Sequence, residues 1–265
     1  MLKNQLSKIN IYIALLLLAF VLKGLFFVAI IPMFQGSDEY IHYATVQYLA
    51  EPKEKTWPIT NEPLTVTDTK NIPAFHYTQE IAGFSTLTES WNFSGAPHNT
   101  QNFTPADIQN VESQMQSGAF PPYIDRYPPT IIYNTTFVHR IGSFMEKALA
   151  KENIFERYFA IRTISILYGL IIIICAYFIA LWSGMKKEHS FLLAGIIAFQ
   201  PMLTATTSII NYDPLLIAAF SIFLLGAVSV LAHNLRFSNT ITMVAATVIA
   251  LYTKGTGGVL IFLTA

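Results

Sequence analysis

The chain has 265 residues, of which 53% are hydrophobic and only 12% are charged, whereas about a quarter of the residues in an ordinary soluble domain are charged. This composition predicts an integral membrane protein. The net charge is zero and there is no basic motif, which excludes a nucleic-acid-binding protein. The single cysteine, Cys175, lies in an apolar run, so the chain can form neither an intrachain disulfide nor a cysteine-based metal site.

The first apolar segment begins like a secretory signal peptide, with Lys3 and Lys8 before "IYIALLLLAFVL". However, the apolar run resumes after Lys23 and no small-x-small cleavage site follows it. We therefore predict an uncleaved signal anchor at residues 11–34, within a first domain of residues 1–34. Lys23 lies near the middle of this span and should snorkel, pair or face a polar cavity.

A long polar interval follows at residues 35–157. It holds every acidic residue of the chain except Glu188 and Asp213, most of the prolines and many aromatic residues. Because a disordered linker would lack those aromatic residues, we predict an ordered, partly helical loop on the membrane surface. Its helices are expected near residues 38–50, 105–117 and 130–150.

Four further apolar segments are found at residues 158–182, 190–208, 214–232 and 240–265, the last interrupted by "TKGTGG". Segments of about 19 residues or more can cross about 30 Å of hydrocarbon. We therefore predict an all-α membrane protein of about five transmembrane helices, with a loop domain at 35–157 and a membrane domain at 158–265. Since the apolar sequence continues to the last residue, we expect this chain to be the front part of a longer protein.

The positive charges of the short segments predict the orientation, because long loops cross the membrane regardless of charge. Lys186, Lys187 and Arg236 lie on the same side as the N-terminal lysines, whereas the short turn "SIINYDP" has no positive charge. The N-terminus is therefore expected in the cytoplasm and the long loop outside.

The stretch "SDEYIHYATVQYL" opens the long loop with two adjacent carboxylates, Asp38 and Glu39. Ser37 can cap a helix whose first turn favours carboxylates by about 0.3–1 kcal/mol, which is a purely structural explanation. His42 lies four residues after Asp38, so the three side chains can share one helix face. Such a cluster also suits a general base or a ligand of Mg²⁺ or Mn²⁺, although it is a weak metal signature. Both interpretations stay open on these residues alone.

Other charged residues have comparable alternatives. Asp213 begins an apolar helix before Pro214, either as a helix-start carboxylate or as part of a site on the outer side. Lys254, at a glycine-broken helix, and Arg162, about one turn inside the second span, can meet an anion or snorkel. Arg126 precedes "YPPTIIY", whose proline pair predicts a helix start.

Taken in order, five motifs resemble the N-terminal half of the GT-C superfamily of integral-membrane glycosyltransferases, which use sugars linked to polyprenyl phosphate. They are "SDEYIHYATVQYL", "RYPPTIIY", "FAIRTISILYGL", "SIINYDPLLIAA" and "LYTKGTGGVL". Their order is similar to that in the lipid A aminoarabinose transferases and the protein O-mannosyltransferases. An uncharacterised group of bacterial membrane proteins of the same superfamily is closer, because it shares the D-E-x-x-H form and the asparagine-aspartate turn.

The resemblance implies that Asp38 is catalytic, with Glu39 beside it, and that it deprotonates an acceptor hydroxyl or helps to bind a divalent cation. His42, Asp213 and Tyr127 would support the site; Tyr127 stands where the family often has histidine or lysine. Cations would stabilise the leaving lipid phosphate, and the candidates are Lys254, Arg126 and Arg162.

The implied function is inverting transfer of a sugar from a polyprenyl-phosphate donor to an envelope glycan, lipid or protein, on the outer face of a bacterial cytoplasmic membrane. The alternative is a non-catalytic membrane protein: an assembly partner, or a binder or transporter of lipid-linked sugars. Only the transferase requires Asp38 and Asp213 to border one outward-facing cavity.

Overall fold

A computed structural model describes residues 11–31, 33, 34, 36, 38–50, 106, 109, 113, 135–233 and 237–264. The chain divides into two compact units. Unit 1 contains residues 1–30, 136–138 and 159–265, and unit 2 contains residues 31–135 and 139–158. The described residues form helices and no strand, which confirms the predicted all-α class.

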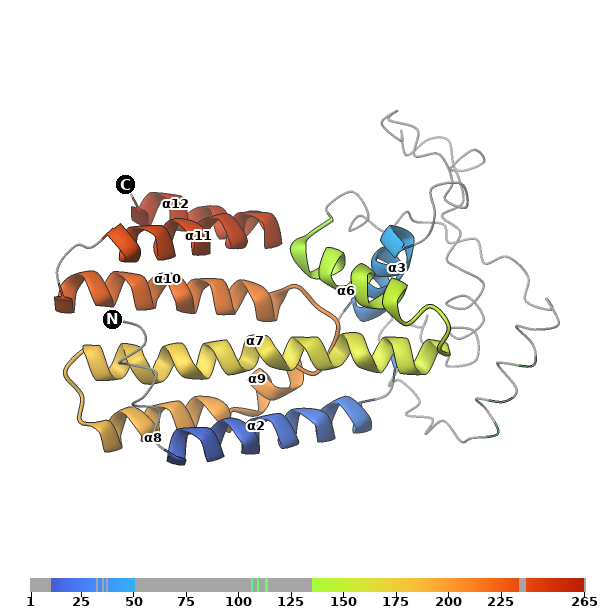
Figure 1. Cartoon of the computed structure of the whole chain (residues 1–265), viewed down its shortest axis with the longest axis horizontal. Helices are drawn as coiled ribbons and strands as arrows, with labels where there is room; N and C mark the ends of the chain where they lie inside the picture. Colours follow the sequence, from blue (N-terminus) through green and yellow to red (C-terminus); the bar gives the residue numbers. More distant parts are fainter. Residues whose placement is uncertain are drawn as a thin grey trace, which may run out of the picture. The chain divides into compact units, whose positions relative to one another are not determined.

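Three described helices are long and apolar enough to cross a membrane (Figure 1): α2 (Ile11–Ile30), α7 (Ile154–Trp182) and α10 (Asp213–His233). They correspond to the predicted spans 11–34, 158–182 and 214–232. Leucine side chains stay exposed on the outer faces of α2 and α10, for example Leu22 and Leu231. Lipid is the solvent that such faces need, because water would make their exposure costly.

The predicted span 190–208 is two helices rather than one, α8 (Lys187–Ala198) and α9 (Pro201–Thr206). Pro201 has no amide hydrogen with which to continue α8, and it disfavours a helical conformation at Gln200, which is extended. Proline instead fits the first residue of α9. The difference from the sequence prediction therefore comes from one residue inside an otherwise apolar run.

The last apolar segment is also interrupted. It contains α11 (Phe237–Thr253), the 3₁₀ helix η2 (Gly255–Gly258) and α12 (Val259–Thr264). Lys254 is extended and separates α11 from η2, at the glycine-broken position that the sequence indicated. α11 is apolar but, at 17 residues, shorter than the three spanning helices.

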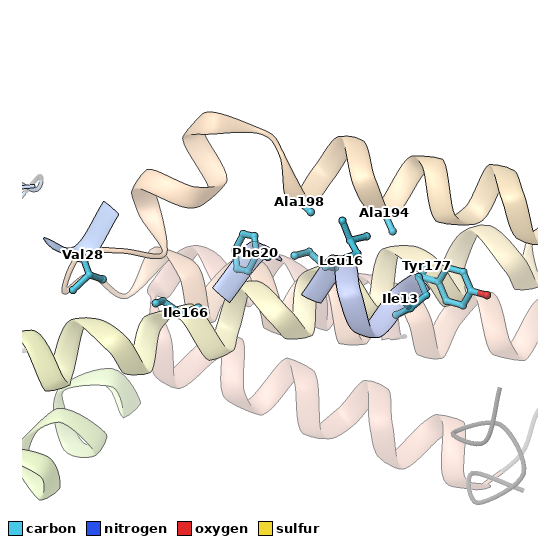
Figure 2. Close-up of a cluster of buried hydrophobic side chains, with 9 residues drawn as sticks. Ile13, Leu16, Phe20, Val28, Ile166, Tyr177, Ala194 and Ala198 are labelled. Atoms are coloured by element: carbon cyan, nitrogen blue, oxygen red, sulfur yellow. The ribbon is translucent and has the colours of Figure 1, made fainter. Parts of the chain in front are cut away.

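The core of unit 1 packs α2 against α7 and α8 (Figure 2). It comprises Ile13, Leu16, Phe20 and Val28 of α2, Ile166, Ile173 and Tyr177 of α7, and Ala194 and Ala198 of α8. A Cβ on Gly169 would lie 2.5 Å from the ring of Phe20. Glycine and alanine at these positions let the helices approach closely, which is how helices gain packing energy in lipid.

A second core cluster joins α10, α11 and α12. Its buried members are Ala219, Phe223, Ala246, Ala250 and Leu260. The 3₁₀ turn lies directly on α11, because a Cβ on Gly257 would be only 2.3 Å from the carbonyl oxygen of Ala250. The neighbouring Gly255 has open space at the equivalent point.

Both ends of α7 are set by local hydrogen bonds. At its start the side chain of Asn153 accepts the N–H of Glu156 at 3.0 Å, which is an N-cap contact. At its end the N–H of Gly184 donates to Leu181 and the N–H of Met185 donates to Ala180. Gly184 has φ 89°, the left-handed conformation that this type of helix end requires.

Lys23, predicted to snorkel, pair or face a cavity, has aromatic neighbours. Its ammonium lies 6.0 Å from the ring centre of Phe27 and 5.4 Å from that of Phe199, at the end of α8. Aromatic faces attract cations, so these rings offset part of the cost of a lysine in a membrane span.

Unit 2 contains α3 (Glu39–Ala50), most of α6 (Phe137–Ala148) and the start of α7. α3 confirms the predicted helix 38–50. α6 begins at Phe137, because Thr135 and Thr136 are not helical, and the earlier part of the predicted helix 130–150 lies outside the described residues. In the predicted helix 105–117, the described residues Ala106, Gln109 and Ser113 are helical.

The close contact at Gly257 gives a first testable prediction. Gly257→Ala should destabilise the protein by about 1–3 kcal/mol, because the new methyl group would overlap the backbone of α11. Gly255→Ala is the matched control and should change stability little. Thermal unfolding of both purified variants in the same detergent measures the difference, and equal midpoints would contradict the packing described for η2.

Candidate functional site

Asp38 occupies a tight connection between α2 and α3. Its side chain is exposed, and its carbonyl oxygen accepts the N–H groups of Ile41 and His42, both at 3.0 Å. Asp38 has φ 56°, and Phe34, four residues earlier, has φ 62°. Aspartate tolerates this left-handed conformation, whereas for a bulky residue such as phenylalanine it is a strained outlier that costs about 1–3 kcal/mol.

Neighbouring groups hold this strained connection in place. The N–H of Phe34 donates to the hydroxyl of Tyr158 at 2.8 Å, and the Phe34 ring packs edge-on against the Tyr158 ring, with 5.2 Å between the centres. Tyr43 of α3 packs edge-on against the same tyrosine at 5.0 Å. All three residues are buried, so Phe34 is held by both a hydrogen bond and ring packing.

Glu39 behaves differently from Asp38, although the two are adjacent. Its side chain is fully buried, and its carboxylate accepts the N–H of Gly36 at 3.1 Å. The N–H of Glu39 donates back to the carbonyl of Gly36 at 3.2 Å. These reciprocal bonds brace the turn, so the structure gives Glu39 a contact suited to positioning Asp38.

His42 is buried against a residue that the sequence did not single out, His139 of α6. Their Nδ1 and Nε2 atoms lie 2.9 Å apart and their rings are stacked. Burial, together with the nearby His42, lowers the pKa of His139 to about 3. His139 is therefore neutral near neutral pH, and one imidazole donates a hydrogen bond to the other.

A buried carboxylate on α6, Glu146, forms the centre of unit 2. It makes an ion pair with Arg157 of α7, and it accepts hydrogen bonds from the hydroxyl of Tyr43 at 3.2 Å and from the amide of Gln47 at 3.1 Å. Arg157 also donates to the carbonyl of Glu152 at 3.1 Å. A buried charge is tolerated only when it is paired and hydrogen-bonded in this way.

In unit 1, two residues that the sequence singled out separately form an ion pair. The ammonium of Lys254 lies 2.9 Å from the carboxylate of Asp213 and 4.6 Å from the ring centre of Tyr212. The side chains of Lys254 and Asp213 are 36% and 40% exposed. Because an exposed pair adds only about 0–1 kcal/mol to stability, this pair is of little use as a structural contact.

Arg162, predicted to bind a lipid phosphate, is fully buried. Its guanidinium donates to the carbonyl of Val28 at 3.2 Å and lies 5.8 Å from the ring centre of Phe159. Val28 is in the last turn of α2, whose carbonyl groups have no partner within the helix. Arg162 therefore closes the end of α2, and its role in binding a lipid phosphate stays a prediction.

The remaining predicted site residues, Arg126 and Tyr127, lie outside the described residues. Asp38 belongs to unit 2 and Asp213 to unit 1, and their convergence on one cavity stays a prediction. In the part of the chain that the structure describes, no three His, Cys, Asp or Glu side chains gather closely enough to hold a metal ion.

The pairing partners within unit 2 were missed by the sequence analysis. His139, Ser143 and Glu146 recur every three or four residues along α6 and are all buried. This stripe is visible in the sequence, but a polar stripe ordinarily indicates the solvated face of a helix. The sequence did contain one signal: the opposite side of α6 has apolar residues at the same helical spacing, namely Phe137, Ile141 and Phe144.

The buried ion pair generates a second prediction. Glu146→Gln should destabilise the protein by about 3–5 kcal/mol, because it leaves the Arg157 guanidinium buried without a carboxylate. Glu152→Gln is the matched control, since that exposed residue meets Arg157 through its backbone carbonyl, which the substitution keeps. Chemical unfolding in detergent compares the two, and equal loss in both variants would contradict the central role of Glu146.

The buried histidine pair predicts a pH dependence. The pKa of His139 falls from the ordinary 6.5 to about 3 on folding, so the unfolded chain binds more protons between these values. Protonation of His139 therefore does not reduce the free energy of unfolding above pH 6.5. Below that value the free energy of unfolding declines as the pH falls towards 3, by about 1.4 kcal/mol per pH unit at most.

Unfolding midpoints measured between about pH 7 and about pH 5 test this linkage. The native chain should lose stability over that interval, and His139→Gln should lose clearly less. His189→Gln, at an exposed histidine, should keep the native slope. If the His139 variant also kept that slope, the histidine pair would not be its source.

Residues 11–265 match the family described as "Predicted membrane protein (DUF2142)". No curated protein and no solved structure matches the chain. Because the match covers nearly the whole chain and agrees with its apolar helices, the chain belongs to the DUF2142 family of predicted membrane proteins.

Proposed function

We propose that the protein is an inverting glycosyltransferase of the bacterial cytoplasmic membrane. It moves a sugar from a polyprenyl-phosphate donor to an envelope glycan, lipid or protein acceptor on the outer face. The N-terminus is cytoplasmic in this proposal, and residues 35–157 lie outside. The ordered set of GT-C-like motifs supports the reaction class, and the setting of Asp38 supports the site.

The observation that carries the proposal is the contrast between Asp38 and its buried neighbours. Glu39 and His42 are buried, whereas Asp38 is exposed at the end of a strained connection. A fold that holds a strained residue such as Phe34 by several contacts is a recognised feature of functional sites. Asp38 is therefore exposed next to residues that are buried and held by several contacts, which suits the positioning that catalysis requires.

Asp38 acts as the general base. Its carboxylate takes the proton of the acceptor hydroxyl while the hydroxyl oxygen forms a bond to the anomeric carbon of the sugar. The bond from that carbon to the phosphate oxygen breaks on the opposite face, and the lipid phosphate leaves with the bonding electron pair. Attack opposite the leaving group inverts the anomeric centre.

Lys254 stabilises the leaving phosphate. An ammonium has three donor hydrogens, so the contact with one Asp213 oxygen leaves others for phosphate oxygens. Asp213 orients the lysine side chain, and the Tyr212 ring lies against the ammonium. Charge-assisted hydrogen bonds of this kind are about twice as strong as neutral ones, which suits a group whose negative charge grows during the reaction.

The Asp213–Lys254 pair also favours the alternative, a non-catalytic binder or transporter of lipid-linked sugars. In the pair the lysine charge is already balanced by a carboxylate, as in a site that binds a lipid phosphate reversibly. This alternative needs Lys254 but not the carboxylate of Asp38. Substitution of Asp38 therefore separates the two functions.

Asp38→Asn should lower sugar transfer by about 100-fold or more, because the amide cannot accept the hydroxyl proton. The measurement follows radiolabelled sugar from the lipid-linked pool to acceptors in membranes that contain the full-length protein. Insertion and unfolding midpoint should match those of the native protein. Glu152→Gln, which neutralises another exposed acid of unit 2, should retain activity.

Native rates in correctly inserted Asp38→Asn would remove the catalytic assignment. If donor lipid still bound to that variant and native protein also failed to transfer sugar, the binder or transporter would replace the enzyme.

A further inference from the structure

Helix α6 turns its polar face inward and its apolar face outward, which is the reverse of a surface helix in a soluble protein. The face turned inward carries His139, Ser143 and Glu146, all buried, and it contributes to the hydrogen bonds and the ion pair of unit 2. The face turned outward carries Phe137, Ile141 and Phe144, which are 36%, 41% and 71% exposed. Residues three or four positions apart lie on one side of a helix, so these three side chains form a continuous apolar stripe.

Cations border this apolar stripe. Arg140, Lys147 and Lys151 are all exposed. The spacing of seven residues places Arg140 and Lys147 on one edge of the stripe, and Lys151 follows in the turn after α6. The only acid of α6, Glu146, is buried against Arg157. The exposed surface of α6 is therefore apolar along its centre and positively charged along one side.

The start of α6 lies at the end of a membrane helix. The Phe137 ring packs against the ring of Tyr252 at 5.5 Å, and Tyr252 is the second-last residue of α11 and is 66% exposed. Val138 is buried in a cluster with Tyr168 of α7 and Ala218 of α10. Exposed aromatic rings at the ends of apolar helices are typical of the membrane–water boundary.

The end of α6 is also close to that boundary. A turn over residues 149–153 connects it to α7, which is 29 residues long, or about 43 Å at 1.5 Å per residue. This exceeds the thickness of the hydrocarbon core, about 30 Å, so part of α7 extends into the headgroup region. The first turn of α7 carries the charged residues Glu156 and Arg157, so this end of the helix suits the headgroup region. Glu146 pairs with Arg157, which keeps α6 beside that turn.

We propose that α6 lies in the lipid interface, with Phe137, Ile141 and Phe144 inserted among the acyl chains and Arg140, Lys147 and Lys151 bound to anionic phospholipid headgroups. An amphipathic helix with cations at the edge of its apolar face binds membranes by both contacts. Lipid contacts the exposed face of α6, while Glu146 and His139 on its buried face bind it to the rest of unit 2. This role does not depend on sugar transfer.

A depth-sensitive fluorophore tests the apolar contact. The full-length Cys175→Ser protein with Phe144→Cys, labelled with a nitrobenzoxadiazole dye, is reconstituted in nanodiscs that contain phosphatidylglycerol and brominated phosphatidylcholine. The label should lose about half of its fluorescence to the lipid bromines, because interfacial helices bury their apolar face about 5–10 Å deep. Labels at Leu231 on α10 and at the exposed Glu188 near the start of α8 provide the lipid-facing and water-facing references.

The charged edge is tested separately with brominated phosphatidylglycerol. The label at residue 144 should be quenched more by this anionic lipid than by brominated phosphatidylcholine, and Arg140→Gln, Lys147→Gln and Lys151→Gln combined should abolish the preference. Lys186→Gln with Lys187→Gln removes exposed cations elsewhere and should preserve it. An unchanged preference in the triple variant would overturn the headgroup contact.

Three further outcomes would also overturn the proposal. Quenching of the label by aqueous iodide, as at Glu188, would place the stripe in water. Protection from both bromine and iodide would mean that protein covers the stripe, either residues 51–134 of this chain or another protein. Equal quenching of labels at residue 144 and at the Ser143 position on the inward face would show that the helix does not present one face to lipid.

Discussion

Unit 2 depends on the buried carboxylate of Glu146. A charge without water is stable only if ionic and hydrogen-bonding partners surround it, and here the partners come from two other helices. Arg157 belongs to α7, while Tyr43 and Gln47 belong to α3. One side chain on α6 therefore joins α3 and α7, beside the packed rings of Phe34, Tyr43 and Tyr158.

This packing has consequences at the two surfaces of unit 2. Tyr158, next to Arg157, packs against Phe34 and Tyr43. It therefore stabilises the strained residue Phe34 in the connection that leads to Asp38. Because the polar stripe of α6 faces inward to supply Glu146 and His139, its apolar stripe must face outward. The exposed acid and the exposed apolar stripe thus have a common cause, although only the acid is part of the proposed chemistry.

Unit 1 follows the opposite principle. Its helices are apolar on nearly all sides and pack through small residues such as Gly169 and Ala194, as expected where lipid replaces water. Two of its charged groups have defined partners: Arg162 closes the end of α2, and Lys254 meets Asp213 where α10 begins. The side chains of the Asp213–Lys254 pair are partly exposed, so a polar ligand can reach them.

The sequence by itself determined the all-α membrane class, the spans at α2, α7 and α10 and the helix at α3, because long apolar runs and helix-start signals are local properties of the chain. It also indicated Asp38, Asp213 and Lys254 by charge and position. Only the tertiary structure decided that Asp213 pairs with Lys254, that His42 meets His139 and that Glu39 is buried while Asp38 is exposed. The physical reason is that such pairs join residues far apart in sequence. A helical period shows that α6 has two faces, but which of them turns inward depends on the groups that the other helices supply.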